Sequence, residues 1–564
     1  MKKIIVILII AFFYNVVNAK NTIVVDTNMY NIDYNLKLIL VNQNIGDINS
    51  LWEGYKVSVL LKNEEYIFKN DVEKLNIGVA YEVEDSNHES YILYFTELPI
   101  IEINTEAEIE KENRVLAHFK MSENNQNYTV SPIGISYRGA TSFYYPKKSF
   151  RIEFLQDQIG GQTKDVSLLG MRSDDDWNLQ AMYNEPLRFR SKTNNELWRK
   201  VYIPYYKFEE PDAINGVKME YAELFLNGKY LGIYCVSERV DRKQLKLKKY
   251  NGNIKGELYK GVEWGIPTFR WLIEYENGND IWGGFKYIYP DETIPLWDNL
   301  FDFAYLVVNE KNSIFYTTYK SKFDFDNSVD YFIFLNLLRI GDNVGKNIYI
   351  ARYKTDEPYF YVPWDLDGSF GNGWTGGRDD YVYDLMSNGL YDRLWDDCSK
   401  DGFREKLKSR WNQLRTTLIT HDDLMQMFQK NFEYLFINGV YERESITWPD
   451  YKLNMGDLDY ISDWITRRLN YLDEKFNSVC DIVIKDTPVE IYPNPASDFL
   501  IFDISGSKSK FDVVIYNING QIMLSSCIDN ENNEIKLNNL VNGVYFVNVR
   551  NDRLNNFWKI IVQK

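Results

Sequence analysis

Short runs of alternating apolar and polar residues dominate the first part of the chain, and 56–61 and 91–95 are clear examples. Successive side chains of a strand point to opposite faces, so alternation with a period of two predicts half-buried strands. The pattern returns over 132–155, where 148–154 alternates strictly. We therefore expect a β-rich leader domain at 20–105 and further strands at the start of the domain that follows.

The middle of the chain, 106–486, mixes helical and strand patterns. Apolar residues recur at helical spacing in three segments, 185–200, 295–345 and 402–478. Strand patterns at 221–226 and 230–236 flank Asn227-Gly228, a dipeptide typical of tight hairpin turns. This mixture predicts an α+β central domain.

The spacing changes again near Pro488. Beyond it, short strand patterns are separated by Asn-Gly turns such as Asn519-Gly520 and Asn542-Gly543. Short strands with regular turn signals are typical of a β-sandwich, so we expect 487–564 to form one such domain.

Residues 1–19 have the layout of a signal peptide. Lys2 and Lys3 precede an apolar run at 4–14, and small residues at 17–19 offer a cleavage site. The run is too short for a membrane anchor, because the core of a bilayer is ~30 Å thick. No later apolar run is long enough to span a bilayer, so we expect an exported mature chain without a transmembrane segment.

Composition narrows the classes of function. The 564 residues are 45% hydrophobic and 26% charged, which is ordinary for a globular protein. A net charge of −17 argues against nucleic-acid binding, which depends on Lys and Arg to neutralise phosphates. The three histidines are too scattered for a histidine zinc site. The four cysteines lack a CxxC spacing, so we expect neither a thiolate metal cluster nor a disulfide framework.

A specific resemblance attaches to the tail. Five short stretches carry it in order: 491–496, which reads Ile-Tyr-Pro-Asn-Pro-Ala, then 513–517, 520–521, 540–545 and 559–562. Together they resemble the C-terminal sorting domain of type IX secretion in Bacteroidetes. The resemblance implies passage through the periplasm, recognition by the type IX secretion machinery, and release or attachment at the outer-membrane surface.

Two acidic clusters could carry chemistry, since no complete phosphate loop, dinucleotide fingerprint or nucleophile elbow occurs. Asn347 lies five residues beyond Asp342, and Asp365 follows an apolar strand pattern 23 residues beyond Asp342. Protein kinases use this spacing. An Asp orients the acceptor hydroxyl, an Asn five residues on binds metal, and an Asp about twenty residues later binds metal again. Each cluster by itself is also typical of a turn or a strand end.

A basic turn lies upstream of these clusters. Arg138-Gly139 opens a turn that extends to Ser142, and Lys147 and Lys148 begin the next strand pattern. One interpretation is a solvated basic edge of a sheet. The other places the backbone amides of 139–142 near a phosphate, with one lysine reaching it.

Together these motifs resemble the spore-coat CotH kinase family over residues 110–480. The stretches that carry the resemblance are 138–152, 168–170, 174–179, 185–186, 190–192, 223–234, 237–241, 342–347 and 363–367. The resemblance implies an atypical, secreted protein-kinase-like fold. It also implies an enzyme that uses ATP and a divalent metal, Mg²⁺ or Mn²⁺, to phosphorylate Ser or Thr of secreted or surface proteins.

Carried over to this sequence, the resemblance makes Asp342 the residue that orients the acceptor hydroxyl. Asn347 and Asp365 would hold the metal, with Asp367 as the second choice of ligand. Glu238 follows the apolar strand where kinases place their adenine hinge, so it would lie near the base.

The same carry-over assigns the phosphate-binding lysine to Lys148, with Lys147 as the alternative and Arg138 also beside the nucleotide. Lys148 shares a face of the alternating strand with Phe150 and Ile152. The base of its side chain would therefore lie inside the fold.

The sequence also departs from ordinary protein kinases. It has no glycine-rich lid and no His-Arg before Asp342, and Asp-Leu-Asp-Gly at 365–368 replaces Asp-Phe-Gly. The alternative is therefore a catalytically inactive, kinase-like surface protein with a binding or structural role, such as an adhesin or a glycan binder. The 43 Tyr, 32 Phe and 14 Trp would suit glycan stacking. Convergence of Asp342, Asn347, Asp365 and a buried lysine on one cleft would favour the enzyme.

Overall fold

The computed structural model describes most of the chain, in the ranges 22–51, 54–125, 127–159, 161–480, 489–504, 510–529, 532–551 and 555–564. The predicted signal peptide, 1–19, lies outside the described residues. Contacts divide the chain into two compact units, with the division between Ser478 and Val479. Within the described ranges, no helix is both long enough and apolar enough to cross a membrane.

The leader forms a seven-stranded sheet with both parallel and antiparallel pairs. Its strands run in the order β1 (Thr22–Val25), β4 (Lys56–Leu61), β5 (Glu64–Val72), β6 (Tyr81–Glu84), β7 (Ser90–Phe95), β3 (Leu38–Val41) and β2 (Tyr30–Asp33), with the short helix α2 (Ile45–Ser50) beside them. The predicted alternation is observed, because Val59 and Leu93 are buried in the leader core whereas Val57 is exposed.

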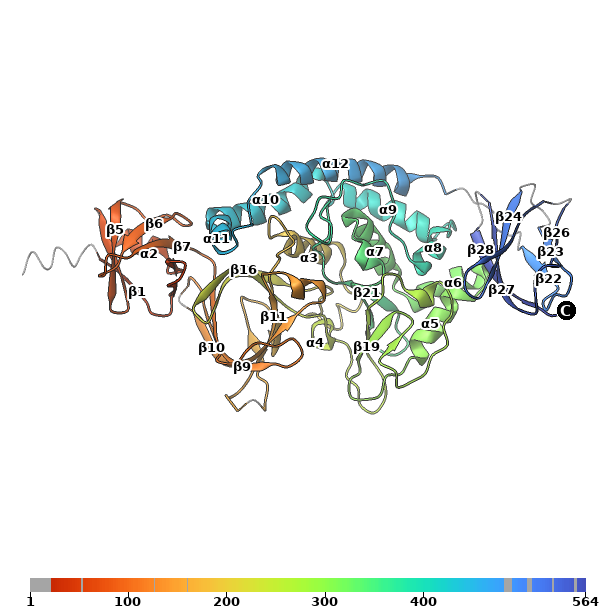
Figure 1. Cartoon of the computed structure of the whole chain (residues 1–564), viewed down its shortest axis with the longest axis horizontal. Coiled ribbons are helices and arrows are strands. Elements are labelled where there is room, and N and C mark those ends of the chain that lie inside the picture. Colours follow the sequence, from red (N-terminus) through yellow and green to blue (C-terminus); the bar gives the residue numbers. More distant parts are fainter. Residues whose placement is uncertain are drawn as a thin grey trace, which may run out of the picture. The chain divides into compact units, whose positions relative to one another are not determined.

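The next sheet closes into a barrel (Figure 1). Its strands run in the order β10 (Tyr128–Arg138), β11 (Ser149–Phe154), β14 (Asp176–Gln180), β16 (Lys229–Ser237), β15 (Met219–Leu226), β8 (Ile100–Asn104) and β9 (Val115–Ser122). The hairpin prediction is confirmed, because Asn227 and Gly228 join β15 to β16 with positive φ values of 50° and 72°. Strand β8 falls within the range expected for the leader, yet it pairs with β15 and β9 in the barrel.

Beyond the barrel lies a second sheet with helices packed around it. Its strands run in the order β18 (Ile281–Trp282), β19 (Phe285–Tyr289), β17 (Glu257–Gly261), β20 (Ile348–Arg352) and β21 (Tyr359–Pro363). The helices are α3 (Arg190–Val201), α4 (Arg242–Leu245), α5 (Asp298–Val308), α6 (Asn312–Lys322), α7 (Phe325–Leu338), α8 (Gly389–Trp395), α9 (Phe403–Arg415), α10 (His421–Ile437), α11 (Val440–Thr447) and α12 (Gly456–Asn477). Short elements complete this unit: β12 (Val166–Ser167), β13 (Ser173–Asp174), η1 (Thr141–Tyr144), η2 (Pro267–Phe269) and η3 (Gly341–Val344).

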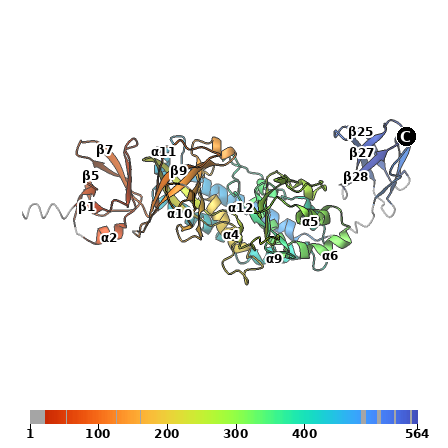
Figure 2. The ribbon, with the colours of Figure 1, turned by 90° about the horizontal axis from the view of Figure 1, so that it is seen from below.

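The helical predictions are confirmed, since 185–200 contains most of α3, 295–345 contains α5 to α7, and 402–478 contains α9 to α12. Helices α10 and α11 lie beside the barrel, whereas α8 and α9 lie beside α5 and α7 (Figures 1 and 2). The long helix α12 packs against α7, α9 and α10, so it links the two halves of this unit. Helices and sheets are both extensive, which confirms the α+β class.

The four cysteines fall into two classes. Cys398 and Cys480 are disulfide-bonded, whereas Cys235 and Cys527 are free. The sequence predicts no disulfide framework and does not single out these two bonded cysteines, because widely spaced cysteines leave no spacing signal.

The second unit is all-β and contains two sheets. One has the order β22 (Glu490–Tyr492), β23 (Phe499–Asp503) and β26 (Glu534–Lys536), and the other has the order β25 (Ile522–Ile528), β24 (Phe511–Asn517), β27 (Gly543–Arg550) and β28 (Asn555–Val562). Leu500 of the first sheet shares one buried core with Val513, Val547 and Ile560 of the second. A single core therefore serves both sheets.

Candidate functional site

A cavity of about 540 Å³ lies where one end of the barrel meets the loops of the second sheet. The barrel contributes the turn between β10 and β11, and the other wall contains η3 and the segment after β21. The predicted site residues that line the cavity are Arg138, Lys147, Asp342, Asn347, Asp365 and Asp367. Lys148 and Glu238 are not among the lining residues.

Pairing of β20 with β21 brings the two acidic clusters together. Ile348 lies opposite Pro363, so Asn347 and Trp364 are neighbours at the open end of the hairpin. The Trp364 N–H donates to the carbonyl of Asn347 at 3.0 Å, and Asn347 Nδ2 donates to Asp365 Oδ2 at 3.4 Å. Asp365 has a φ of +60°, a left-handed conformation that few residues adopt and that often marks a functional position.

Asn343 fixes the loop that carries Asp342, and sequence analysis missed it. Its Nδ2 donates to the carbonyl of Asn347 at 2.7 Å and to that of Trp364 at 2.8 Å. The Tyr331 hydroxyl donates to the carbonyl of Asn343 at 2.9 Å. The side chain of Asn343 is buried, and its bonds tie η3 to the residues that flank the β20–β21 hairpin. The available sequence signal was an Asn directly after the predicted catalytic Asp.

Three carboxylates, Asp342, Asp365 and Asp367, crowd into this part of the cavity, and we call them the cavity acids. Burial raises the pKa of Asp342, while Lys346 opposes the rise and Asp365 adds to it. Burial, followed by the charges of Asp365 and Glu185, raises the pKa of Asp367 to about 8. Repulsion of this kind is relieved when a cation binds among the carboxylates.

The oxygen atoms of this wall fit a hard divalent cation. Asp365 and Asp367 offer carboxylate oxygens, and Asn347 offers a carboxamide oxygen. Neither His nor Cys lines the cavity among the described residues. Mg²⁺ and Mn²⁺ prefer oxygen ligands, so the residues present suit these ions.

The two lysines of the β10–β11 turn face different ways. Lys147 is fully buried, and its Nζ donates to Glu444 Oε1 at 2.6 Å and to the carbonyl of Ile233 at 2.7 Å. Lys148 is half-buried, and its Nζ donates to the carbonyl of Phe143 at 2.5 Å. Of these two lysines, only Lys147 lines the cavity.

The half-buried Lys148 agrees with the expectation that the base of its side chain lies inside the fold, but Lys148 does not line the cavity. Phe150 and Ile152 do point into the apolar interior of the barrel, as the alternation predicts. The cavity, however, lies outside the barrel, where Ser149 lines it from the opposite face of the strand. Lys147 shares the parity of Ser149, so it is the lysine that reaches the cavity.

Electrostatics keep the pair of Lys147 and Glu444 charged at neutral pH. Burial lowers the pKa of Lys147 to about 8, although Glu444 opposes the change. Burial alone would raise the pKa of Glu444, but Lys147 and Arg188 hold it below its usual range. Arg188 Nε donates to Glu444 Oε2 at 3.0 Å.

Cations crowd on the barrel side of the cavity. Burial lowers the pKa of Arg138; Asp365 opposes the change, and the guanidinium groups of Arg239 and Arg151 add to it. Burial and Arg138 likewise lower the pKa of Lys260, which also lines the cavity. Repulsion between like charges of this kind favours the binding of an anion.

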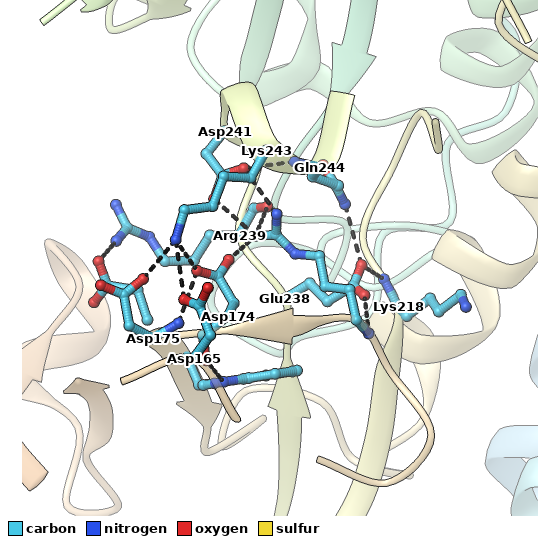
Figure 3. A network of polar contacts seen from close by, with 12 residues as sticks. Asp165, Asp174, Asp175, Lys218, Glu238, Arg239, Asp241, Lys243 and Gln244 are labelled. Carbon is cyan, nitrogen blue, oxygen red and sulfur yellow. Dashed lines mark hydrogen bonds and ion pairs between the residues drawn. The ribbon is translucent and has the colours of Figure 1, made fainter. Parts of the chain in front are cut away.

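Glu238 serves as an internal anchor outside the cavity lining (Figure 3). Its carboxylate accepts hydrogen bonds from the backbone N–H groups of Lys218 at 3.0 Å and Arg172 at 3.3 Å. Gln244 Nε2 donates to it at 3.3 Å. The structure therefore does not bring Glu238 to the cavity, and its expected place beside the base has no support here.

A second acidic group lies around Lys243 (Figure 3). Asp165, Asp174 and Asp175 place carboxylate oxygens within 4.8 Å of one another, and we call these residues with Lys243 the lysine-filled cluster. Lys243 Nζ lies 3.2, 3.1 and 2.9 Å from the three carboxylates in that order. Arg172 also pairs with Asp174. The chain itself thus supplies the cations of this cluster.

Comparisons with known proteins match both units. The family model described as CotH kinase protein matches residues 135–472, a span that contains every predicted site residue. The model described as secretion system C-terminal sorting domain matches residues 490–563. Inner spore coat protein H of Bacillus subtilis (strain 168) is 21% identical over 347 residues, which cover 61% of this chain and 86% of that protein.

Proposed function

Because the chain belongs to the CotH kinase protein family, we propose that it transfers the γ-phosphoryl group of ATP to Ser or Thr hydroxyls. Its substrates in this proposal are secreted or surface proteins. The observation that carries the proposal is one shared cavity, which is lined by Asp342, Asn347, Asp365 and Lys147. Kinases arrange the same kinds of group around the phosphoryl that they transfer.

The sorting domain at 490–563 indicates export or cell-surface localisation by type IX secretion. An exported kinase would meet secreted and surface proteins, which agrees with the substrates proposed here. The type IX secretion machinery is the proposed partner during export.

In this proposal Asp342 orients the acceptor hydroxyl and accepts its proton. Asp342 lines the cavity, and the raised pKa of its carboxyl makes it a better base than an ordinary Asp. Asn343 is a positioning residue, because it anchors the loop of Asp342 through two carbonyl groups. A carboxylate that only orients a hydroxyl acts in the transition state and adds little to ATP affinity.

Asp365 and Asn347, with Asp367 as a further ligand, would hold Mg²⁺ or Mn²⁺. When bound, the metal neutralises the charge that develops on the transferred phosphoryl. Asp365 and Asn347 are adjacent across the β20–β21 hairpin, so a short, rigid segment positions both groups. The crowding of the cavity acids supports this role, since their mutual repulsion is lowered by a cation.

The barrel side of the cavity would bind the phosphates of ATP. Lys147 and Arg138 offer positive charge, and 139–142 offer backbone amides along the same wall. Gly139 has a φ of +104°, and a Cβ there would lie 1.9 Å from Ser142 Oγ. Glycine therefore allows a tight turn whose backbone faces the cavity directly.

Transfer of radiolabel tests the proposal. The mature chain, 20–564, would be incubated with γ-labelled ATP, Mg²⁺ or Mn²⁺, and secreted proteins of the same organism. We expect label on Ser or Thr, loss of labelling with a chelator, and loss of labelling with Asp342→Asn. Asp280→Asn is a matched control, because Asp280 is exposed and does not line the cavity.

Absence of labelled protein from a folded wild-type chain that still binds ATP would contradict the proposal. Such a result would leave the alternative of an inactive, kinase-like surface protein with a binding or structural role.

A further inference from the structure

Glu444 occupies the centre of a buried charge cluster beside the cavity, far along the sequence from the other charged groups. Besides Lys147 and Arg188, it accepts a hydrogen bond from the Ile233 N–H at 2.9 Å. Gly232 makes this approach possible, because a Cβ there would lie 1.9 Å from Glu444 Oε1. The surrounding groups therefore fix the carboxylate closely.

The carboxylate of Glu444 in turn fixes the direction of the Lys147 ammonium. An ammonium has three N–H donors, and Glu444 Oε1 and the carbonyl of Ile233 accept two of them. Lys147 lines the cavity although its side chain is fully buried, and the Tyr234 ring centroid lies 5.0 Å from its Nζ. In the proposed function, the remaining donor is the one available to an anion in the cavity. Buried ion pairs add little net stability in general. We therefore attribute the pair of Lys147 and Glu444 to the orientation that it gives the ammonium, and not to a gain in stability.

Glu444 belongs to α11, which has only eight residues. A helix this short is not stable by itself in water, so its position depends on its neighbours. One side of α11 packs against β16, the strand that carries Ile233. Arg443, the preceding residue, forms an ion pair with Glu223, and its Nε donates to the Tyr230 hydroxyl at 3.2 Å.

The leader domain holds α11 through side chains. The Tyr94 hydroxyl on β7 donates to Glu442 Oε2 at 3.2 Å. The Tyr94 ring centroid lies 5.1 Å from the Arg443 guanidinium, close enough for a cation–π contact. Thr96 Oγ1 donates at 2.9 Å to Oδ1 of Asn438, which lies just before the helix.

Backbone contacts extend the same interface. A Cβ at Gly78 of the leader would lie 2.1 Å from the carbonyl oxygen of Ile437, and a Cβ at Gly439 would lie 2.4 Å from the carbonyl oxygen of Gly78. The Tyr230 N–H on β16 donates to Asp33 Oδ2 of the leader at 2.8 Å. The leader thus contacts both the start of α11 and the strand beside it.

We propose that the leader domain is a positioning element for the cavity, because it holds α11 where Glu444 meets Lys147. This inference rests on the proposed kinase function, in which Lys147 binds phosphate. The leader lies outside the matched span of 135–472, so the family match does not imply this role. Glu444 and Tyr94 act through other residues, since neither lines the cavity.

The test compares variants of the mature chain. Tyr94→Leu removes the hydroxyl and the ring beneath Arg443 but keeps an apolar side chain in the core that Tyr94 shares with the barrel. Tyr94→Phe keeps the ring. Tyr91→Leu is a matched control, because Tyr91 is a buried tyrosine of the same strand whose ring packs on Tyr66 within the leader. Hydrogen exchange of 440–447 and steady-state kinetics with ATP are measured for each variant.

We expect Tyr94→Leu to speed hydrogen exchange in 440–447 by about fivefold or more, because exchange reports local opening. The KM for ATP should rise about three- to tenfold with a smaller change in kcat, since a misplaced lysine weakens phosphate binding. Tyr94→Phe should restore most of both values. Tyr91→Leu should leave both at the wild-type level.

Glu444→Gln should raise the KM for ATP by at least as much as Tyr94→Leu. The Tyr94 variants keep the test valid if Glu444→Gln fails to fold.

Unchanged exchange and unchanged KM in Tyr94→Leu, with an active wild type, would overturn the inference and leave the proposed function standing. Equal changes in Tyr91→Leu would overturn it as well, because they would report general loss of leader stability. If the wild type neither binds nor uses ATP, the proposed function fails, and this inference fails with it.

Discussion

The cavity acids and the lysine-filled cluster use the same residue type in opposite ways. In the lysine-filled cluster, three carboxylates lie within 3.2 Å of Lys243 Nζ, and Arg172 adds a second cation. No lysine or arginine among the described residues forms an ion pair with a cavity acid, although Lys346 and Arg138 act electrostatically on Asp342 and Asp365, and the pKa of Asp367 is raised to about 8. An acidic cluster therefore indicates a cation site only where the chain does not supply the cation itself.

Asp342→Asn should have the largest effect on phosphoryl transfer. The substitution keeps the size of the side chain but removes its basicity, so we expect a loss of about 10²-fold or more. Melting temperature and metal-dependent ATP binding should change little, because this carboxylate acts in the transition state. Labelling assays and thermal unfolding measure the two effects. An unfolded variant would instead make Asp342 a turn-forming structural residue, and undiminished transfer would place the reaction elsewhere.

Asp365→Asn should abolish the stabilisation that ATP with Mg²⁺ gives to the fold. A ligand present at about a hundred times its Kd stabilises a protein by about 2.7 kcal/mol, and Asp365 would be needed for most of that binding. Asp174→Asn, in the lysine-filled cluster, should retain the full shift. Thermal unfolding with ATP, with and without a chelator, measures the difference. Equal shifts in both variants would remove Asp365 from the metal role.

Lys243→Met should convert the lysine-filled cluster into one that resembles the cavity acids. Loss of a half-exposed ammonium from three carboxylates should cost about 1 kcal/mol of unfolding free energy. Added Mg²⁺ or Ca²⁺ should recover part of the loss, because the carboxylates then lack their cation. Urea denaturation with and without the divalent ion measures this recovery. If neither the substitution nor the added ion changed the free energy of unfolding, Lys243 would not neutralise the cluster.

Lys147 of the cavity and Lys243 of the lysine-filled cluster should differ in their response to pH. The pKa of Lys147 is lowered to about 8, so its ammonium loses its proton as the pH rises through 8, whereas the pKa of Lys243 is raised and it stays charged. The KM for ATP should therefore rise by up to about tenfold between pH 7 and pH 9, because the charged fraction of Lys147 falls from roughly nine-tenths to roughly one-tenth. Lys147→Arg should remove this pH dependence, because arginine stays charged. A KM that is flat across this range in the wild type would contradict the assignment.

Much of the acidic wall could be predicted from the sequence because its geometry is local. Asn347 and Asp365 flank two consecutive strand patterns, and an antiparallel hairpin between them makes the flanking residues neighbours. The Asn227-Gly228 turn and the long helical segments were likewise encoded in short stretches.

The other parts of the site depend on contacts between segments that are distant in the sequence, and no local pattern predicts such contacts. Strand parity correctly predicts which residues enter the barrel. It cannot show that the cavity lies outside the barrel, so the sequence favours Lys148 over Lys147 as the phosphate-binding lysine. Glu238 is held by backbone amides from two other segments. Glu444 lies 297 residues from Lys147 on a short helix with no motif of its own.

The binding of Mn²⁺ tests the central claim most directly, namely that the cavity acids hold the catalytic cation whereas the lysine-filled cluster does not. Electron paramagnetic resonance would follow free Mn²⁺ during titration into wild-type protein with ATP, into Asp365→Asn and into Asp174→Asn. We predict ATP-dependent binding in the wild type and in Asp174→Asn, and none above background in Asp365→Asn. Binding that survives in Asp365→Asn but disappears in Asp174→Asn would contradict the account.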